Sequence, residues 1–469
     1  MKKIAIIGAG SVIFCKTLMM DILATPALAD SEFRLMAPST RNTSQVKAFM
    51  DQVIESAGLS ATVYVTTDRR EALTGADYVI LCYSIGGIRA YEIDCDVPLK
   101  YGVDICIGDT LAPGGIFRAL RTIPVTRDLC ADVREVCPNA LILNYVNPMA
   151  AISWTLGNEG MNFVGLCHGV QTTLDLIAGY TGVPKAEIDY TCAGINHMAW
   201  FTRLFHEGVD LYPKLKEVFE KPEYYVNDKV RGEVLRNFGY FCTESTGHLS
   251  EYLPYFRKNR KALDLYCDQP DFGGETNANL KFTRYVAQKL GGRILDDDVP
   301  VLGARSVEYC SYILEAFATG VPFRFNGNVI NNGLISNLPQ DCCAEGPIIA
   351  DANGLHRQPV GELPWHLAAL NLSNISCQRL TVQAAYSGDP DEVVHAVAMD
   401  PLASAVLTLG EIREMCAEVL EKQAEWLPQF AGKKLAPRPI ISIPENVVPE
   451  PVPVDPALAV MGRFAQLGK

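Results

Sequence analysis

The stretch that decides the fold is KIAIIGAGSVIF, residues 3–14. Residues 3–8 form a short run that is continuously apolar after Lys3, which is typical of a strand buried on both faces of a sheet. Gly8 allows a tight turn after this strand, and Gly10 lets the backbone approach a pyrophosphate at the N-terminus of the next helix. Ile13 replaces the third glycine of the full fingerprint. In this strand–turn–helix context the pattern predicts NAD(P) binding; the alternative is a structural turn.

Similar apolar runs recur along the first 200 residues, with helical patterns between them. The further predicted strands are residues 33–37, 62–67, 77–84, 140–146 and 163–168, and the helical patterns include 13–24, 42–57 and 126–137. This alternation predicts an α/β fold with a Rossmann-like, doubly wound parallel sheet, as in lactate and malate dehydrogenases. Gly86 and Gly87 follow the fourth strand, at the carboxyl edge where ligands of such sheets bind.

The regularity fades from about residue 190, and the rest of the chain reads as mixed helices, short strands and turns. We therefore expect a dinucleotide-binding domain over 1–195 and an α+β domain for substrate, metal and oligomerisation over 196–430. Residues 431–469 contain many prolines and predict an extended C-terminal arm.

Composition limits the class of protein. The chain has 469 residues, 48% of them hydrophobic, and a net charge of −13, which disfavours binding to nucleic acid or to an anionic membrane. No stretch reaches the roughly 18 apolar residues that a membrane helix needs. The 15 cysteines are odd in number and irregularly spaced, which indicates reduced thiols in a cytoplasmic protein.

Cysteine and histidine side chains follow neighbouring strands of the predicted sheet. Cys167 and His168 end one strand, and His197 ends the next. Cys167 and His197 could share one metal ion, with substrate or water oxygens completing the site. Their spacing fits no closed zinc motif, so a buried cysteine and a core histidine are the alternative. Asn147 lies at a third strand end, where an Asn-Pro turn is the alternative.

Together these pieces resemble glycoside hydrolase family 4, the NAD- and metal-dependent glycosidases. The resemblance covers most of residues 3 to about 425 and is strongest to the α-galactosidase (melibiase) branch. The matching stretches include IIGAGSVIF (6–14), DTLAPGGIFRALRTIP (109–124), LNYVNPMA (143–150), VGLCHGVQ (164–171), CAGINHMAWF (192–201), GYFCTESTGHLSEY (239–252) and NGLISNLPQDCCAE (332–345).

The resemblance implies a mechanism that differs from the usual two-carboxylate displacement. NAD⁺ takes a hydride from sugar C3, a base removes the acidified C2 proton, and the C1 substituent is eliminated. Water then adds and the hydride returns, while a divalent metal, usually Mn²⁺, polarises the C2 and C3 oxygens. The GDT block (108–110) stands where phospho-glycosidases carry Gln-Glu-Thr, which favours a non-phosphorylated sugar. Family members are usually homodimers or homotetramers.

Site residues carry over by resemblance. Cys167 and His197 match the metal ligands, Asn147 lies between the substrate hydroxyls and the nicotinamide, and Asp109 and His168 match substrate or leaving-group contacts. The positions expected to bind the cofactor are Gly8, Gly10, Ser11, Ile13, Gly86, Gly87 and Asn147.

The base that removes the C2 proton is left open between Glu244, Tyr252 and neither of them. Glu244 aligns with an acid/base aspartate proposed in the family's α-glucosidases, whereas Tyr252 could equally be a core tyrosine. His248 contacts sugar hydroxyls or caps a turn. Arg89, in GGIRAY, is a cation that could meet an anionic substituent on the sugar.

Three other functions stay open at this point. The chain could be a glucosidase or a glucuronidase or galacturonidase of the same family. It could be a simple NAD(P)-dependent dehydrogenase, or a non-catalytic protein that senses a sugar or nucleotide.

Residues 33–42, FRLMAPSTRN, fill the place where the family normally carries an aspartate that binds the adenosine ribose. Ala37 cannot accept these hydrogen bonds, and their loss is expected to weaken NAD binding by roughly 1–3 kcal/mol. The missing carboxylate also no longer repels a 2′-phosphate, which Ser39, Thr40 and Arg41 could receive. We therefore predict loosened NAD affinity and tolerance of NADP; the alternative is that a backbone group or water replaces the acid.

Overall fold

The computed structural model describes residues 1–267, 274–290, 299–439, 441–453, 455–457, 459, 460 and 464. The chain forms two compact units, Met1–Ala436 and Pro437–Lys469. The second unit is a proline-rich segment whose described residues are largely exposed. The first unit contains the sheet, the core and the candidate site, and the following description concerns it alone.

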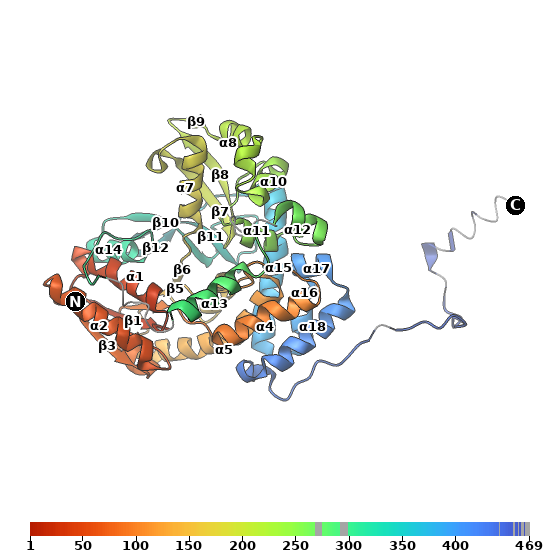
Figure 1. Ribbon diagram of the computed structural model, residues 1–469, viewed down its shortest axis with the longest axis horizontal. Helices are drawn as coiled ribbons and strands as arrows, with labels where there is room; N and C mark the ends of the chain where they lie inside the picture. The colour runs from red at the N-terminus through yellow and green to blue at the C-terminus, as the bar shows by residue number, and fades with distance from the viewer. Residues whose placement is uncertain are drawn as a thin grey trace. The chain divides into compact units, whose positions relative to one another are not determined.

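The described residues of this unit build one twelve-stranded sheet (Figure 1). Its first half is parallel, in the order β3-β2-β1-β4-β5-β6, which is the order of a dinucleotide-binding fold. The strands of this half are β1 (Lys3–Ile7), β2 (Glu32–Met36), β3 (Thr62–Thr66), β4 (Tyr78–Leu81), β5 (Leu141–Asn144) and β6 (Phe163–Gly165). The prediction of a Rossmann-like parallel sheet is confirmed, with each strand inside its predicted range or one residue from it.

The second half of the sheet is antiparallel and continues the first without a break. Residue Asn328 of β10 pairs with Gly165 of β6, and Glu345 of β11 pairs with Gly194 of β7. The strands of this half are β10 (Phe323–Ile330), β11 (Cys343–Asp351), β12 (Gly354–Arg357), β7 (Asp189–Ile195), β8 (Met198–His206) and β9 (Val209–Asp210). The mixed α+β part predicted after the parallel sheet is thus attached to the same sheet; the predicted division at residues 195 and 430 stays a prediction.

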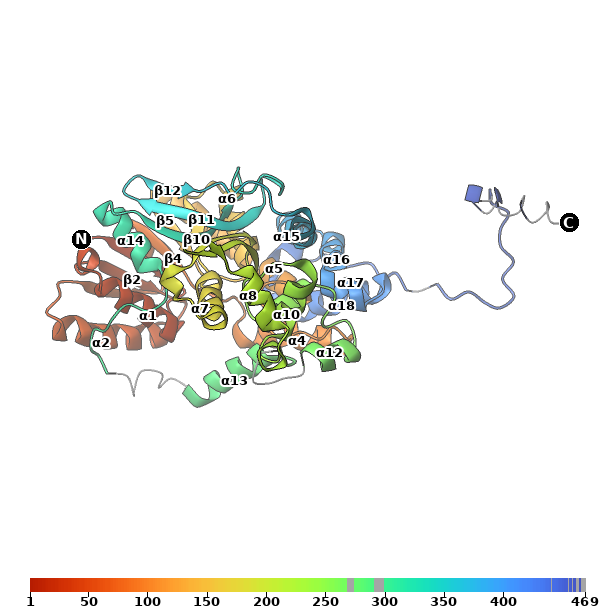
Figure 2. The ribbon, with the colours of Figure 1, turned by 90° about the horizontal axis from the view of Figure 1, so that it is seen from above.

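Helices cover the sheet and form a block beside it (Figures 1 and 2). The helices of the parallel half are α1 (Val12–Leu23), α2 (Thr40–Ser56), α3 (Arg69–Leu73), α4 (Gly87–Lys100), α5 (Ala112–Val136), α6 (Met149–Asn158) and α7 (Gly169–Thr181). The later helices are α8 (Tyr212–Phe219), α9 (Pro222–Tyr225), α10 (Lys229–Phe238), α11 (Thr246–Tyr252), α12 (Arg260–Tyr266), α13 (Ala278–Leu290), α14 (Cys310–Thr319), α15 (Trp365–Ser387), α16 (Pro390–Ala398), α17 (Pro401–Val406) and α18 (Leu409–Lys422). Within the described residues, every helix is too short or too polar to traverse a lipid bilayer.

Helix α5 begins at Ala112, well before the helical pattern predicted over residues 126–137. A Cβ atom on Gly115 would overlap the backbone of Thr110, so a glycine lets the loop that precedes the helix lie directly against its first turn. This close approach fixes the loop that carries Asp109.

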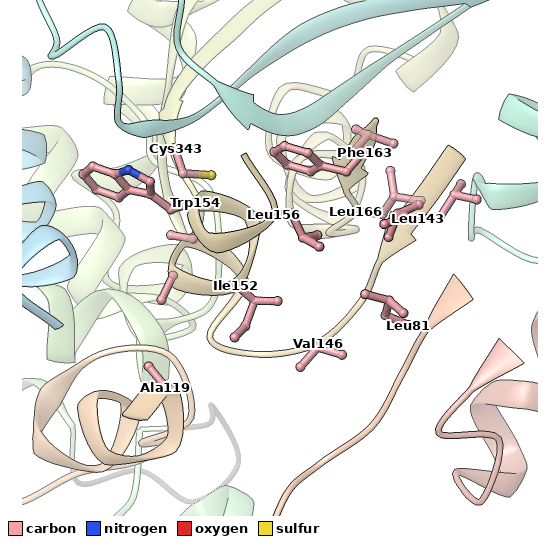
Figure 3. Close-up of a cluster of buried hydrophobic side chains, with 14 of the residues drawn as sticks. Leu81, Ala119, Leu143, Val146, Ile152, Trp154, Leu156, Phe163, Leu166 and Cys343 are labelled. Carbon is pink, nitrogen blue, oxygen red and sulfur yellow. The ribbon is translucent and has the colours of Figure 1, made fainter. Parts of the chain in front are cut away.

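One part of the main hydrophobic core lies between the central strands and helices α5 and α6. Figure 3 shows Leu81 of β4, Leu143 of β5 and Trp154 and Leu156 of α6 among its buried side chains. Full burial of a large apolar side chain stabilises the fold by about 1.5–3 kcal/mol. All 15 cysteines are free thiols and most are buried, which agrees with the predicted lack of a disulfide framework.

A buried ion pair joins α4 to α5. The side chains of Arg121 and Asp94 are both 0% exposed, and two hydrogen bonds of 2.8 and 2.5 Å connect them. The Arg121 Nε atom donates to the carbonyl of Ile85, and Gln423 bonds to both partners. Burial raises the pKa of Asp94, while Arg121 opposes the rise. Every polar atom of this pair is used, so Arg121 is a structural residue.

Candidate functional site

The carboxyl ends of β1, β4, β5 and β6 border a cavity of about 590 Å³. This is the edge at which parallel α/β sheets bind their ligands. The residues that line it are Ser11, Phe14, Cys82, Tyr83, Ser84, Asp109, Arg118, Tyr145, Asn147, Met149, Leu166, Cys167, His168, His197, Glu244, His248 and Asn279.

Three side chains in this cavity form a candidate metal centre. One donor atom each from Cys167, His197 and Glu244 lies within 4.8 Å of the others. The Cys167 Sγ–Glu244 Oε1 distance is 3.4 Å, and the His197 Nε2–Glu244 Oε1 distance is 3.7 Å. Thiolate, imidazole and carboxylate donors bind zinc-sized ions at about 2.0–2.3 Å, so one ion can bridge atoms at these separations. The set fits a divalent transition metal.

The predicted ligands Cys167 and His197 are therefore together, and Glu244 lies between them as a third donor. Burial, and then the Glu244 carboxylate, raises the pKa of the Cys167 thiol. Burial, and then the neighbouring His248, lowers the pKa of His197 to about 4. A neutral imidazole is the form that binds a metal.

The backbone around the two later ligands is unusual. His197 has a φ of 64° and Glu244 a φ of 73°, in the left-handed region that non-glycine residues seldom adopt. His197 lies in the short connection between β7 and β8, and Glu244 precedes α11. A Cβ atom on Gly169 would overlap the Glu244 carboxylate, so this glycine makes room for the third donor. Strain of this kind concentrates at functional sites.

His248 connects the candidate metal centre to the remaining polar groups of the cavity. Its Nδ1 lies 3.2 Å from Glu244 Oε2, and its Nε2 lies 3.3 Å from Asp109 Oδ1. The Asn147 side-chain amide donates to Asp109 Oδ2 at 2.9 Å. Burial lowers the pKa of His248, but its bonds to the two carboxylates outweigh this and raise it to about 10. The imidazolium thus holds Asp109 and Glu244 in place.

The two remaining predicted catalytic residues differ in accessibility. His168 lines the cavity, with its side chain 56% exposed and its Nδ1 3.3 Å from Glu308 Oε1, which raises its pKa. Tyr252 is 1% exposed and does not belong to the cavity lining; its ring centre is 6.1 Å from that of His197. Burial raises the pKa of the Tyr252 hydroxyl well above its ordinary value.

The turn after β1 has the geometry of a cofactor site. Gly8 has a φ of 95°, and a Cβ atom there would lie 2.5 Å from the Tyr83 backbone nitrogen. Ser11 precedes α1 and lines the cavity, Ile13 is half-exposed, and the first turn of α1 contains no acidic side chain. These features fit a bound dinucleotide phosphate.

Other positions predicted to contact ligand lie outside the cavity lining. A Cβ on Gly86 would collide with Ala90 and lie 3.2 Å from Trp426, and Gly87 has a φ of 54°, so both have a structural reason to be glycine. The guanidinium of Arg89 pairs with Glu425 at 3.0 Å, and its side chain is 73% exposed.

Sequence reasoning missed Arg118, which lines the cavity from α5, and Glu308, which bonds to His168. Arg118 and Arg121 both lie in the stretch DTLAPGGIFRALRTIP (109–124). Their spacing in the sequence does not show which of them lines the cavity and which is buried.

A dinucleotide-type parallel sheet, an antiparallel extension and a Cys–His–Glu cluster at their junction define an α/β protein with a candidate metal centre beside a dinucleotide-type turn. Comparison with known families narrows this class. Residues 3–183 match the model of the family 4 glycosyl hydrolases, and residues 192–403 match the model of their C-terminal domain. The chain belongs to family 4 of the glycosyl hydrolases.

Two curated relatives cover most of the chain. An α-galactosidase of Rhizobium meliloti is 44% identical over 92% of this chain and 90% of its own length. An α-galactosidase of Bacillus subtilis is 38% identical over 92% of this chain and all of its own length. The prediction of a family 4 glycoside hydrolase is confirmed, and membership of a hydrolase family favours it over a simple dehydrogenase.

Solved structures support the same fold. A 6-phospho-α-glucosidase from gut microorganisms, in complex with NAD and Mn²⁺, has a TM-score of 0.76 and 21% identity, and covers 91% of this chain and 99% of its own. The 6-phospho-β-glucosidase of Thermotoga maritima, with manganese, NAD⁺ and glucose-6-phosphate, has a TM-score of 0.75 and 20% identity, and covers 92% and 100%.

Proposed function

We propose that the protein uses NAD and a divalent metal to hydrolyse α-galactosides of non-phosphorylated sugars. Mn²⁺ is the first candidate for the metal. The observation that carries the proposal is the meeting of Cys167, His197 and Glu244 in a cavity that also borders the turn after β1. The names of the two relatives with 44% and 38% identity support the galactoside. The ligands named in the two solved structures support the cofactor and the metal.

In this proposal Cys167, His197 and Glu244 hold the metal, and the β1 turn with Ser11 holds the dinucleotide phosphates. When bound, the metal supplies a Lewis acid for two sugar oxygens and NAD supplies a hydride acceptor. The oxygens of Glu244 have separate neighbours, since Oε1 faces Cys167 and His197 while Oε2 faces His248.

The residues around this centre position the sugar. We assign Asn147 and Asp109 to the sugar hydroxyls, because both line the cavity and their mutual hydrogen bond fixes their orientation. His248 holds Asp109 and keeps its own proton. We assign His168, which pairs with Glu308, to the leaving group, because its side chain is the exposed one of the pair. The base for the C2 proton stays open between Glu244, Tyr252 and neither of them.

The cofactor preference follows from the end of β2. Ala37 is buried, while Ser39, Thr40 and Arg41 are exposed at the start of α2. The side chain of Ser39 accepts a hydrogen bond from Arg41 N at 3.3 Å. We infer that NAD is the working cofactor and that NADP is tolerated, since an acidic side chain does not stand at position 37.

We also propose that the enzyme acts in the cytoplasm as a homodimer or homotetramer. The free thiols support a reducing compartment. Light scattering coupled to size exclusion measures the assembly directly.

The test of the activity is hydrolysis of 4-nitrophenyl glycosides with NAD⁺, Mn²⁺ and a thiol. The panel contains α- and β-galactosides, glucosides and glucuronides. We expect cleavage of the α-galactoside with a catalytic amount of NAD⁺ and no net NADH. Cleavage of none of them, with either NAD⁺ or NADP⁺, rejects the proposal.

A further inference from the structure

A buried carboxylate holds the loop that carries Asp109 through its backbone. Three consecutive amides of this loop converge on the side chain of Glu251, which lies in α11 and is 0% exposed. The amides of Cys106 and Ile107 donate to Oε1 at 2.7 and 2.6 Å, and the amide of Gly108 donates to Oε2 at 3.1 Å. Consecutive amides that point at one anion form a nest, and here the anion is part of the protein itself.

The other end of the loop has a second buried anchor. Asp400 is 0% exposed, and its Oδ2 accepts a hydrogen bond from the Ala112 amide at 3.1 Å. Ala112 has a φ of 56°, in the left-handed region that alanine seldom adopts, so surrounding contacts must hold this conformation. Asp109 therefore lies between two fixed points of the backbone.

Helix α11 contacts this loop in two ways. His248 faces the Asp109 side chain at 3.3 Å, and Glu251 holds the backbone directly before Asp109. His248 and Glu251 are three residues apart in the helix, so they lie on the same face. One face of one helix thus fixes both the position and the direction of the Asp109 carboxylate.

The carboxylate of Glu251 is costly for the fold. Burial raises the pKa of Glu251, while the charge of Arg257 opposes the rise. An ion in the interior loses its hydration, and hydrogen bonds and opposite charges must compensate this loss. An apolar side chain would fill the same space without this cost, but it could not hold three amides. The arrangement therefore favours a role for Glu251 in placing the loop.

We propose that Glu251 is a positioning residue of the candidate site, which holds the 106–108 backbone so that Asp109 meets the sugar hydroxyls. The inference rests on the proposed function, which assigns Asp109 to those hydroxyls. Glu251 is not among the residues that line the cavity, so it acts through Asp109. Its replacement should impair the use of the sugar and leave the binding of NAD⁺ at the turn after β1 unchanged.

The test uses the full-length protein with NAD⁺ and Mn²⁺, and the variants Glu251→Gln, Asp109→Ala and their combination. Glutamine has nearly the volume of glutamate, but its NH₂ group cannot accept a hydrogen bond, so at least one amide of the loop loses its partner. Asp68→Asn is the control, because Asp68 also accepts from two backbone amides but is exposed before α3.

Three quantities are measured for each variant. They are kcat/KM for the 4-nitrophenyl α-galactoside, the affinity for NAD⁺ by fluorescence titration, and the hydrogen exchange of the amides of residues 106–108.

We expect E251Q to lower kcat/KM by about 10- to 100-fold, because a displacement of about 1 Å at a group that positions the substrate has an effect of this size. In the D109A background the same change should cost less than about threefold, since residues that act through one contact are not additive. Exchange at 106–108 should become faster in E251Q, with NAD⁺ affinity unchanged, and D68N should match the wild type. Glu251→Asp, which keeps the charge on a shorter side chain, should lie between wild type and E251Q and serves for the same comparison if E251Q does not fold.

Additive losses from E251Q and D109A overturn the inference, and so does unchanged exchange at 106–108 or an equal loss of NAD⁺ affinity. Each of these results leaves the proposed function intact as long as the wild type cleaves the α-galactoside. A wild type that cleaves no glycoside of the panel, together with faster exchange at 106–108 in E251Q, contradicts the proposed function instead and supports Glu251 as the anchor of the loop.

Discussion

Replacement of Glu244 by glutamine separates its two proposed roles, metal donor and base. Glutamine has nearly the same volume and keeps an oxygen for His248, so the fold should persist. The charge that faces Cys167 and His197 at 3.4 and 3.7 Å is lost. If Glu244 completes the metal centre, E244Q should bind Mn²⁺ far more weakly than the wild type.

The expected loss follows from known metal sites. Removal of a residue that only supports a ligand lowers metal affinity by about 10- to 100-fold. A direct donor should reach at least the upper end of this range, which corresponds to about 2.7 kcal/mol.

The assay is titration of Mn²⁺ followed by the paramagnetic resonance signal of the free ion, with no substrate present. Tyr252→Phe is the control, because that side chain is buried outside the cavity lining and should leave the affinity for Mn²⁺ unchanged. An E244Q variant that binds Mn²⁺ like the wild type but is inactive would refute the donor role and favour Glu244 as the base.

Four more predictions concern other parts of the protein. Gly169→Ala should lose Mn²⁺ affinity with its thermal stability largely kept, whereas Gly179→Ala, whose added Cβ meets nothing within 4 Å, should match the wild type in the same titration. Ala37→Asp should tighten NAD⁺ by about 5- to 150-fold and weaken NADP⁺ in fluorescence titrations; an unchanged ratio contradicts the assignment of position 37. Arg121→Met leaves the buried Asp94 carboxylate without its charged partner and should lower the free energy of unfolding in urea by about 3–5 kcal/mol. In metal-free protein the raised pKa of His248, about 10, contributes stability that is complete below its unfolded pKa and disappears as the pH rises through 10, so His248→Gln should destabilise the fold more at pH 6 than near pH 10.5.

The centre of the parallel half could be predicted because β4, β5 and β6 are buried along their whole length, whereas β2 and β3 are only partly buried. β1 and β4 read as continuous apolar runs with a turn directly after them, and such runs are visible without any knowledge of the partner strand. The antiparallel half could not be predicted in the same way. The pairing of Asn328 with Gly165 joins residues far apart in sequence and depends on the tertiary fold.

The candidate site could likewise be predicted only in part. Cys167 and His197 follow strand ends, and the topology of an α/β sheet brings such ends together. Glu244 comes to the same point because its backbone has a φ of 73° and because Gly169 of α7 makes room for its carboxylate. Neither feature produces a periodic pattern in the sequence. Arg118 and Arg121 differ only in which face of α5 carries them.

The unbroken sheet also restricts how this enzyme can change during evolution or engineering. Cys167 follows the last parallel strand, whereas His197 belongs to the antiparallel part, so the candidate metal centre lies across the junction of β6 with β10 and β11. A rotation of one half against the other would break the hydrogen bonds that join these strands. The parallel half therefore cannot be exchanged as an independent module, and a transplant must carry both sides of the junction to retain the proposed metal ligands.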